Sequence, residues 1–116
     1  MESKFGIQCS IAVTKFDELF LNHKRIILLK LIKEKGSINA ASRELRMSYQ
    51  QAWQFIREMN EISPLPLVVR QRGGVNGGGA RLTEFGEKTI KEFEKLVDSF
   101  NALANKLDDR LWLCSF

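Results

Sequence analysis

The chain has 116 residues, of which 44% are hydrophobic and 28% are charged, a balance typical of one folded domain rather than a disordered segment. Its two cysteines and one histidine are too few for a disulfide framework and lack the spacing of zinc ligands. No apolar run approaches the roughly 20 residues of a membrane span, and no signal region opens the chain, so a cytoplasmic location is expected.

The positive charge is concentrated in the middle of the chain. Residues 22–82 carry eleven basic and four acidic side chains, a net charge of +7. Residues 1–21 carry a net charge of −1 and residues 83–116 a net charge of −2, which together give the total of +4. A segment this basic suits a polyanionic partner, although lysines that merely solvate helix faces would give the same charge.

The N-terminal part predicts a strand or small hairpin followed by a helix. Residues 10–14 are rich in β-branched side chains, and residues 18–21, of which the last three are apolar, follow after a short break, which favours paired strands. Asn22 can cap a helix over residues 23–35, and Gly36 can end it. The apolar positions of this helix recur at helical spacing: Ile27, Leu28, Leu31 and Ile32.

Two further helices follow, separated by a tight turn. Ser37 can cap a short helix over residues 38–45, and Arg46 and Met47 form the turn. Ser48 can cap a third helix that runs to about residue 62, with Gln51 completing a capping box. One face of this helix carries Ala52, Ile56, Met59 and Ser63, and the prolines at positions 64 and 66 end it.

A hairpin and a long helix complete the chain. Residues 67–71 and 80–83 are expected to pair as strands across a loop with five glycines in residues 73–79. Thr83 can cap a helix over residues 84–107. Its a/d seam comprises Phe93, Leu96, Phe100, Leu103 and Leu107, beside a second stripe of Ile90, Val97 and Ala104. A domain of this size is not expected to cover both stripes, so the seam predicts a dimer interface.

This order of elements is that of a winged helix-turn-helix, a mainly α fold with a small β component and a long C-terminal dimerisation helix. Small side chains at Ala41, Ser42 and Ala52 allow the second and third helices to approach closely. We expect one domain in three parts: an N-terminal strand or hairpin (1–21), a DNA-binding core (22–83, with its wing at 67–83), and a dimerisation helix with a tail (84–116).

The third helix carries side chains that suit a DNA major groove. Ser48 places backbone N–H groups and the positive end of the helix dipole where a phosphate can bind. The face away from the core carries Tyr49, Gln50, Gln51, Gln54 and Arg57. Glutamine can pair with adenine and arginine with guanine. Phosphate contacts are expected from Arg43, Arg46, Arg70, Arg72 and Arg81. Trp53 has a simpler explanation as a packing residue.

Other functions fit the residues less well. The glycine-rich loop matches neither common nucleotide phosphate-binding pattern. The sequence has no nucleophile–base set and no carboxylate pair placed in an evident cleft, so neither an enzyme activity nor a metal or cofactor is expected. The alternative to a DNA-binding regulator is a non-catalytic winged-helix protein-interaction module, against which the basic charge of residues 22–82 argues.

Several motifs together are characteristic: Gly36-Ser37-Ile38, Ala41, Ser48-Tyr49, Ala52-Trp53, Ile56, Glu58-Met59-Asn60, the glycine tip and Leu82-Thr83-Glu84-Phe85-Gly86. On these residues the chain, from about 20 to 107, resembles the N-terminal DNA-binding domain of the ModE family, which are molybdate-responsive transcriptional regulators. A more distant kinship with the LysR-type winged helix rests on part of the same set.

The ModE resemblance implies a homodimeric regulator that binds double-stranded DNA, and two readers related by a two-fold axis predict a palindromic operator. It also implies DNA contacts from Ser48, Tyr49, Gln50 and Gln51, and from Arg72 and Asn76 on the wing. Full-length ModE proteins sense molybdate through C-terminal oligonucleotide-fold domains, which this chain is expected to lack. Arg46 stands where a glycine is common, which indicates a strained backbone or a phosphate-facing arginine.

Overall fold

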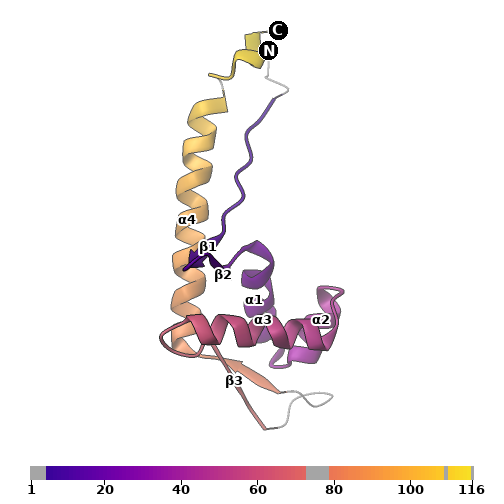
Figure 1. The fold of residues 1–116 in the computed structure, drawn as a ribbon. Helices are drawn as coiled ribbons and strands as arrows, with labels where there is room; N and C mark the ends of the chain where they lie inside the picture. The colour runs from indigo at the N-terminus through magenta and orange to yellow at the C-terminus, as the bar shows by residue number, and fades with distance from the viewer. Residues whose placement is uncertain (1–4, 73–78, 109, 116) are drawn as a thin grey trace.

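The computed structural model describes residues 5–72, 79–108 and 110–115 (Figure 1). In chain order these residues form β1 (Val13–Lys15), β2 (Glu18–Leu21), α1 (His23–Lys35), α2 (Ile38–Glu44), α3 (Tyr49–Ile62), β3 (Val68–Arg70), β4 (Ala80–Leu82), α4 (Glu84–Asp108) and a short 3-10 helix (Trp112–Ser115). The molecule is elongated, with dimensions of 58 × 28 × 22 Å, because α4 projects far beyond the other helices. The predicted winged helix-turn-helix fold is confirmed.

The helix boundaries follow from local capping chemistry. Each predicted capping side chain accepts a backbone hydrogen bond from three residues further on: Asn22 from Arg25 (2.9 Å), Ser37 from Ala40 (3.1 Å), Ser48 from Gln51 (3.0 Å) and Thr83 from Gly86 (2.9 Å). These bonds satisfy amide groups that have no partner inside the helix. The C-terminus of α1 is closed by Gly36, which has a φ of 63° and donates to the Ile32 carbonyl at 2.8 Å.

Both hairpins are antiparallel and short. β1 and β2 are joined by Phe16 and Asp17, which have φ values of 51° and 65° and form a two-residue turn. β3 and β4 form the wing, in which Arg70 lies opposite Ala80. The wing is tied to the rest of the domain because the Ala80 amide donates to the Gly36 carbonyl at 3.1 Å. The loop-side end of the wing strands is therefore joined to the connection between α1 and α2.

The core lies where α1, α3 and the wing meet. The predicted inner face of α3 is confirmed, since its four residues are all buried: Ala52, Ile56, Met59 and Ser63. The predicted face of α1 is only half right. Leu28 and Ile32 are buried, but so are Ile26 and Leu29, whereas the two remaining predicted residues are partly exposed. α1 is the central helix and contacts α2, α4 and β4, so its buried surface is wider than one stripe.

The N-terminal turns of α4 pack against α1. Ile90 and Phe93 join the hydrophobic core, and Phe93 is only 2% exposed. Phe93 was expected in the dimer seam, and that prediction is corrected, because a side chain committed to its own core has no surface for a partner. Ala104 of the second stripe is also buried, whereas Leu96 and the seam residues after it remain exposed.

Two exposed ion pairs also link α1 to α4. Lys30 pairs with Glu94 at 2.6 Å and Lys33 with Glu87 at 2.7 Å. The hydrogen bond and the charge of Lys33 lower the pKa of Glu87 below its ordinary value. A lowered pKa means that this stabilisation is present above the ordinary glutamate range and is lost as the pH falls through the folded-state value. No helix in the described part of the chain is both long and apolar enough to cross a bilayer.

Candidate nucleic-acid interface

The turn between α2 and α3 is tight and contains a left-handed residue. Arg46 has a φ of 55°, and its amide donates to the Arg43 carbonyl at 3.0 Å. The next amide, of Met47, donates to the Ser42 carbonyl at 3.0 Å, which closes the turn. A left-handed conformation costs a non-glycine residue about 1 kcal/mol or more. The strained backbone expected at Arg46 is therefore present, and its side chain is exposed.

The outer face of α3 presents the expected polar side chains to solvent. The exposed residues are Ser48, at the cap, and Gln50, Gln51, Gln54 and Arg57 along the helix. Tyr49, expected on the same free face, is instead half-buried and packs against the core. Gln54 donates to Glu58 one turn further on at 3.1 Å, so its amide is already oriented.

Ten of the eleven basic residues of the central segment divide into two groups; the eleventh, Lys24, lies with its ammonium 5.9 Å from the centre of the Phe55 ring. One group forms ion pairs with carboxylates of the same chain: Arg25, Lys30, Lys33 and Lys35. The other group is the set of arginines expected to contact DNA: Arg43, Arg46, Arg57, Arg70, Arg72 and Arg81. All six are exposed, and within the described residues none of them forms an ion pair.

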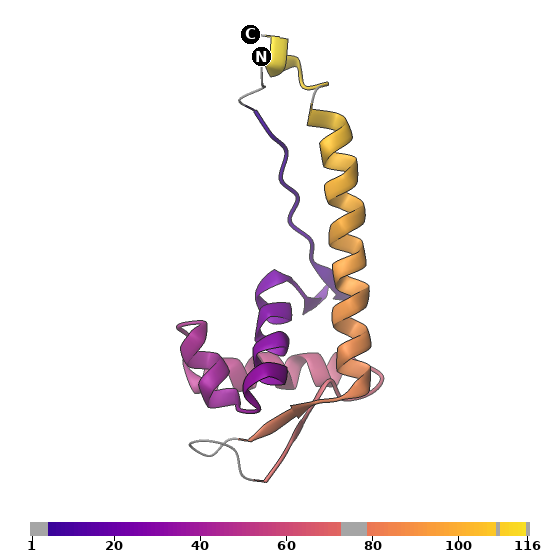
Figure 2. The same ribbon diagram turned by 180° about the vertical axis from the view of Figure 1, so that it is seen from behind.

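These six arginines belong to elements at one end of the molecule. They come from α2, the turn, α3, β3, the start of the wing loop and β4. Figures 1 and 2 place those elements together at the end opposite both chain termini. The remaining residue expected on the wing, Asn76, lies outside the described residues. The uncompensated positive charge therefore gathers around α3 and the wing.

Arg25 is a structural residue that the sequence pattern did not single out. Its side chain is buried, donates to the Leu19 carbonyl at 2.9 Å and pairs with the carboxylate of Glu58. The guanidinium also lies 4.9 Å from the centre of the Phe55 ring. Arg25 thereby fixes β2 against α1 and α3. A lysine or arginine in the first turn of a helix is usually solvated, so no local signal distinguished it.

Asn60 holds the wing against α3. Its side-chain oxygen accepts from the Leu67 amide at 2.8 Å and its side-chain nitrogen donates to the Val68 carbonyl at 3.0 Å. The amide group thus pairs with the beginning of β3 much as a neighbouring strand would. In the sequence Asn60 stands out only as part of the Glu58-Met59-Asn60 motif, which predicts no role for its side chain.

Replacing Asn60 by alanine is expected to destabilise the protein by about 1–3 kcal/mol, because the Leu67 amide and the Val68 carbonyl lose their partner. Urea unfolding of the purified chain measures this effect. Asn105→Ala, at an exposed position of α4, is the matched control and should be nearly neutral. Equal stability of the two variants would contradict the role of Asn60.

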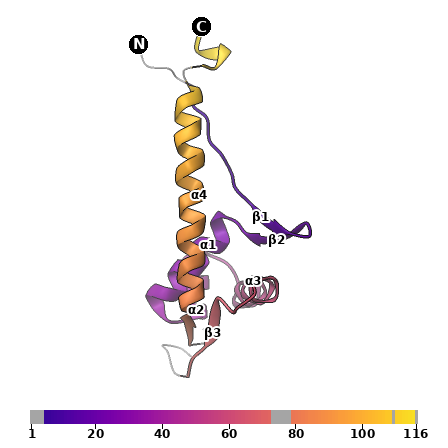
Figure 3. The same cartoon turned by 90° about the vertical axis from the view of Figure 1, so that its left-hand side faces the viewer.

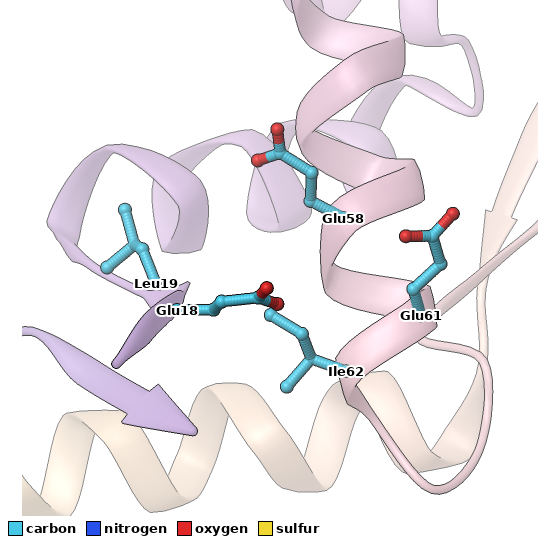
Figure 4. A pocket seen from close by; sticks show the side chains of 5 residues that line it. All are labelled: Glu18, Leu19, Glu58, Glu61 and Ile62. Carbon is cyan, nitrogen blue, oxygen red and sulfur yellow. The ribbon is translucent and has the colours of Figure 1, made fainter. Parts of the chain in front are cut away.

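The C-terminal half of α3 has the opposite electrostatic character. A pocket of about 360 Å³ lies between this half and β2, lined by Glu18, Leu19, Glu58, Glu61 and Ile62 (Figure 4). The carboxylates of Glu18 and Glu61, which form no ion pair among the described residues, would repel a phosphate. The part of α3 suited to a duplex is therefore its first turns. The described residues contain no His, Cys, Asp and Glu group suited to holding a metal ion.

Comparison with known proteins agrees with the winged helix-turn-helix geometry. The family model for bacterial regulatory helix-turn-helix proteins of the lysR family matches residues 23–87, more than half of the chain. The chain belongs to the LysR family of bacterial regulatory helix-turn-helix proteins. In this LysR-type protein the match runs from the first residue of α1 into the first turn of α4, so it includes α3 and both wing strands.

Curated relatives of this LysR-type chain carry the name ModE, as the motifs predicted. The transcriptional regulator ModE of Haemophilus influenzae is 45% identical over 78 residues, which are 67% of this chain and 31% of that protein. The molybdenum transport protein ModE of Azotobacter vinelandii is 40% identical over 91 residues, 78% and 34% of the two chains. The DNA-binding transcriptional dual regulator ModE of Escherichia coli K12 is 40% identical over 102 residues, 84% and 38% of the two chains. The chain thus spans about a third of the length of these relatives.

Proposed function

We propose that this chain is a ModE-like, sequence-specific regulator of transcription that binds double-stranded DNA as a homodimer in the cytoplasm. The observation that carries the proposal is the division of the basic residues. The lysines near α4 are neutralised by carboxylates, whereas the six arginines around α3 and the wing are exposed and unpaired within the described residues. An uncompensated set of arginines beside a helix that carries glutamines suits phosphate and base contacts.

In this proposal the first turns of α3 enter the major groove. Gln50 and Gln51 contact base edges there, with Gln54 and Arg57 one and two turns further along. The cap at Ser48 presents backbone N–H groups to a phosphate, next to Tyr49. The arginines of α2, the turn and the wing contact flanking phosphates, and Asn76 is proposed as a further DNA contact. The acidic pocket stays away from the duplex.

The parts of the chain have separate roles in this proposal. Residues 22–83 form the DNA-reading core, and residues 84–116 provide the dimerisation helix and tail. Residues 1–21 are the N-terminal part, in which β1 and β2 form the hairpin that supports α1 and α3. Two copies joined through α4 present two copies of α3 related by a two-fold axis, which calls for a palindromic operator. No catalytic step is involved, in keeping with the regulator names of the relatives.

The direct test is selection of bound sequences from a random pool of duplex DNA by the purified full chain. We expect enrichment of one inverted repeat. Affinity for the selected site should fall roughly 10³-fold between about 50 and 200 mM salt, as expected for six or more phosphate contacts. Recovery of unenriched sequence, or an affinity that does not change with salt, would contradict the proposal.

The double variant Gln50→Ala, Gln51→Ala is expected to bind the selected site at least 10-fold more weakly, because each base-pairing side chain contributes about 1–3 kcal/mol. Binding to unrelated duplex DNA should change little, because the arginines remain. Fluorescence anisotropy with both duplexes measures the difference. Gln8→Ala, at an exposed position far from α3, is the control. Equal losses on both duplexes would move sequence recognition to another surface.

A further inference from the structure

A stacked pair joins the helix that reads DNA to the wing. The guanidinium carbon of Arg70 lies 4.3 Å from the centre of the Trp53 ring. Trp53 belongs to α3 and is partly buried, and Arg70 is the exposed last residue of β3. Figure 3, which views α3 along its axis, shows β3 beside it.

The stack is the second of two contacts that hold β3 along α3. The first is the Asn60 amide, which binds the backbone of Leu67 and Val68. Trp53 and Asn60 are seven residues apart, about two helical turns, and so lie on the same face of α3. β3 is therefore attached to α3 near both of its ends, at Leu67 and Val68 through Asn60 and at Arg70 through Trp53. Two attachments fix the direction of the wing relative to the helix, which one attachment would not.

Stacking leaves the hydrogen-bonding edge of Arg70 available. A guanidinium is planar, and its N–H groups point outward in that plane, so a ring that covers one face does not occupy them. Among the described residues, the guanidinium of Arg70 makes no ion pair with a carboxylate. The ring thus holds the charge in place while a planar set of donors remains for an anion with two adjacent oxygens.

We propose that Trp53 is a positioning residue that holds Arg70 in the orientation needed for a two-point contact with a DNA backbone phosphate beside the groove that receives α3. This inference rests on the proposed function. A free arginine side chain samples many rotamers, and the ring removes much of that freedom before DNA arrives. The same contact sets the spacing between the base contacts of α3 and the phosphate contact of the wing.

A merely structural stack would have different consequences. Loss of the ring would then lower stability, but Arg70 would contact its phosphate as before, and the dependence of binding on salt would not change. A positioning role predicts that removal of Trp53 and removal of Arg70 affect the same phosphate contact. Their effects on affinity must therefore overlap instead of adding.

The experiment is a double-mutant cycle on the selected DNA site with Trp53→Leu and Arg70→Gln in the full chain. Arg70→Gln should weaken binding about 10-fold and reduce the salt slope by about one phosphate. Trp53→Leu should weaken binding by roughly 3- to 10-fold with a smaller salt slope, and Trp53→Phe, which retains a ring, should fall in between. The double variant should bind about as well as Arg70→Gln alone.

Arg81→Gln provides the matched control cycle. Arg81 lies on the other wing strand and is exposed, and no ring contact involves it among the described residues. Its effect should add to that of Trp53→Leu. The inference would be overturned if the effects of Arg70→Gln and Trp53→Leu on affinity were also additive, or if Trp53→Leu left the salt slope unchanged. Either result would leave the proposed function intact. Absence of DNA binding by the wild-type chain would instead overturn the proposed function.

A second measurement keeps the test valid where a variant folds poorly. In a Trp112→Phe background Trp53 is the one remaining tryptophan, since the chain has two. Arg70→Gln should then change its emission and increase its quenching by acrylamide in the absence of DNA. The selected duplex should protect Trp53 in the chain with Arg70 more than in the Arg70→Gln variant. Equal protection in both would count against the positioning role.

Discussion

Gly86→Ala is expected to destabilise the protein by about 3 kcal/mol, although alanine is the better helix former by about 1 kcal/mol. Gly86 lies in the first turn of α4, where the helix crosses the wing. A Cβ atom there would lie 2.5 Å from the Leu67 carbonyl oxygen and 2.6 Å from a methyl carbon of Leu82. The Leu82 side chain can move, but the carbonyl cannot move alone, because it accepts a hydrogen bond from the Thr83 amide at 2.8 Å.

Thermal and urea unfolding measure this loss, and a decrease of roughly 10 °C in Tm corresponds to it for a domain of this size. Two glycine controls separate the possible causes. A Cβ atom at Gly6 would meet no atom within 4 Å, so Gly6→Ala should be neutral. Gly36 also has open space but a φ of 63°, so Gly36→Ala should cost only about 1 kcal/mol of backbone strain. If Gly86→Ala were as stable as Gly6→Ala, α4 and the wing could move apart without loss of stability, which would contradict the prediction.

The helix boundaries could be predicted because capping depends on residues three positions apart. A capping side chain requires only a nearby amide, as at Asn22, Ser37, Ser48 and Thr83. The glycine that ends α1, Gly36, requires only its own left-handed backbone. The inner face of α3 could be predicted equally well, because the apolar residues on the buried side of a surface helix recur with the helical period. The buried face of α1 was harder to predict, because a helix covered on several sides has no single apolar stripe.

The contacts that fix the wing and the hairpin could not be predicted, because they join residues far apart in the chain. The partner of Arg25 is Glu58, 33 positions further on. Trp53 was expected to have a packing role, but nothing in the sequence placed Arg70 on its ring. The charge count showed that the middle of the chain is basic. It could not show that Lys30, Lys33 and Lys35 pair with carboxylates whereas the six exposed arginines around α3 and the wing form no ion pair among the described residues.

Leu103→Glu is expected to convert the proposed homodimer into a monomer without unfolding the chain. Beyond Phe93, the exposed side of α4 carries Leu96, Phe100, Leu103 and Leu107, which are 41%, 43%, 49% and 39% exposed. Their spacing of four, three and four residues makes one continuous stripe along the projecting half of the helix. A second copy of α4 is the occupant that such a stripe suits. A carboxylate in the middle of that contact would be buried without a partner.

The loss of the dimer should also reduce affinity for the palindromic site. Two linked copies bind their half-sites cooperatively, and this linkage typically raises affinity by about 10²- to 10⁴-fold. The Leu103→Glu chain should therefore have the mass of a monomer in light scattering. It should bind the full site about as weakly as it binds a duplex that carries a single half-site. Ala102→Glu adds the same charge at an exposed neighbouring position off the stripe, and should remain dimeric with near-normal binding. If the wild-type chain is itself monomeric at micromolar concentration, the stripe serves a different protein, and the interaction-module alternative gains the support that the dimer loses.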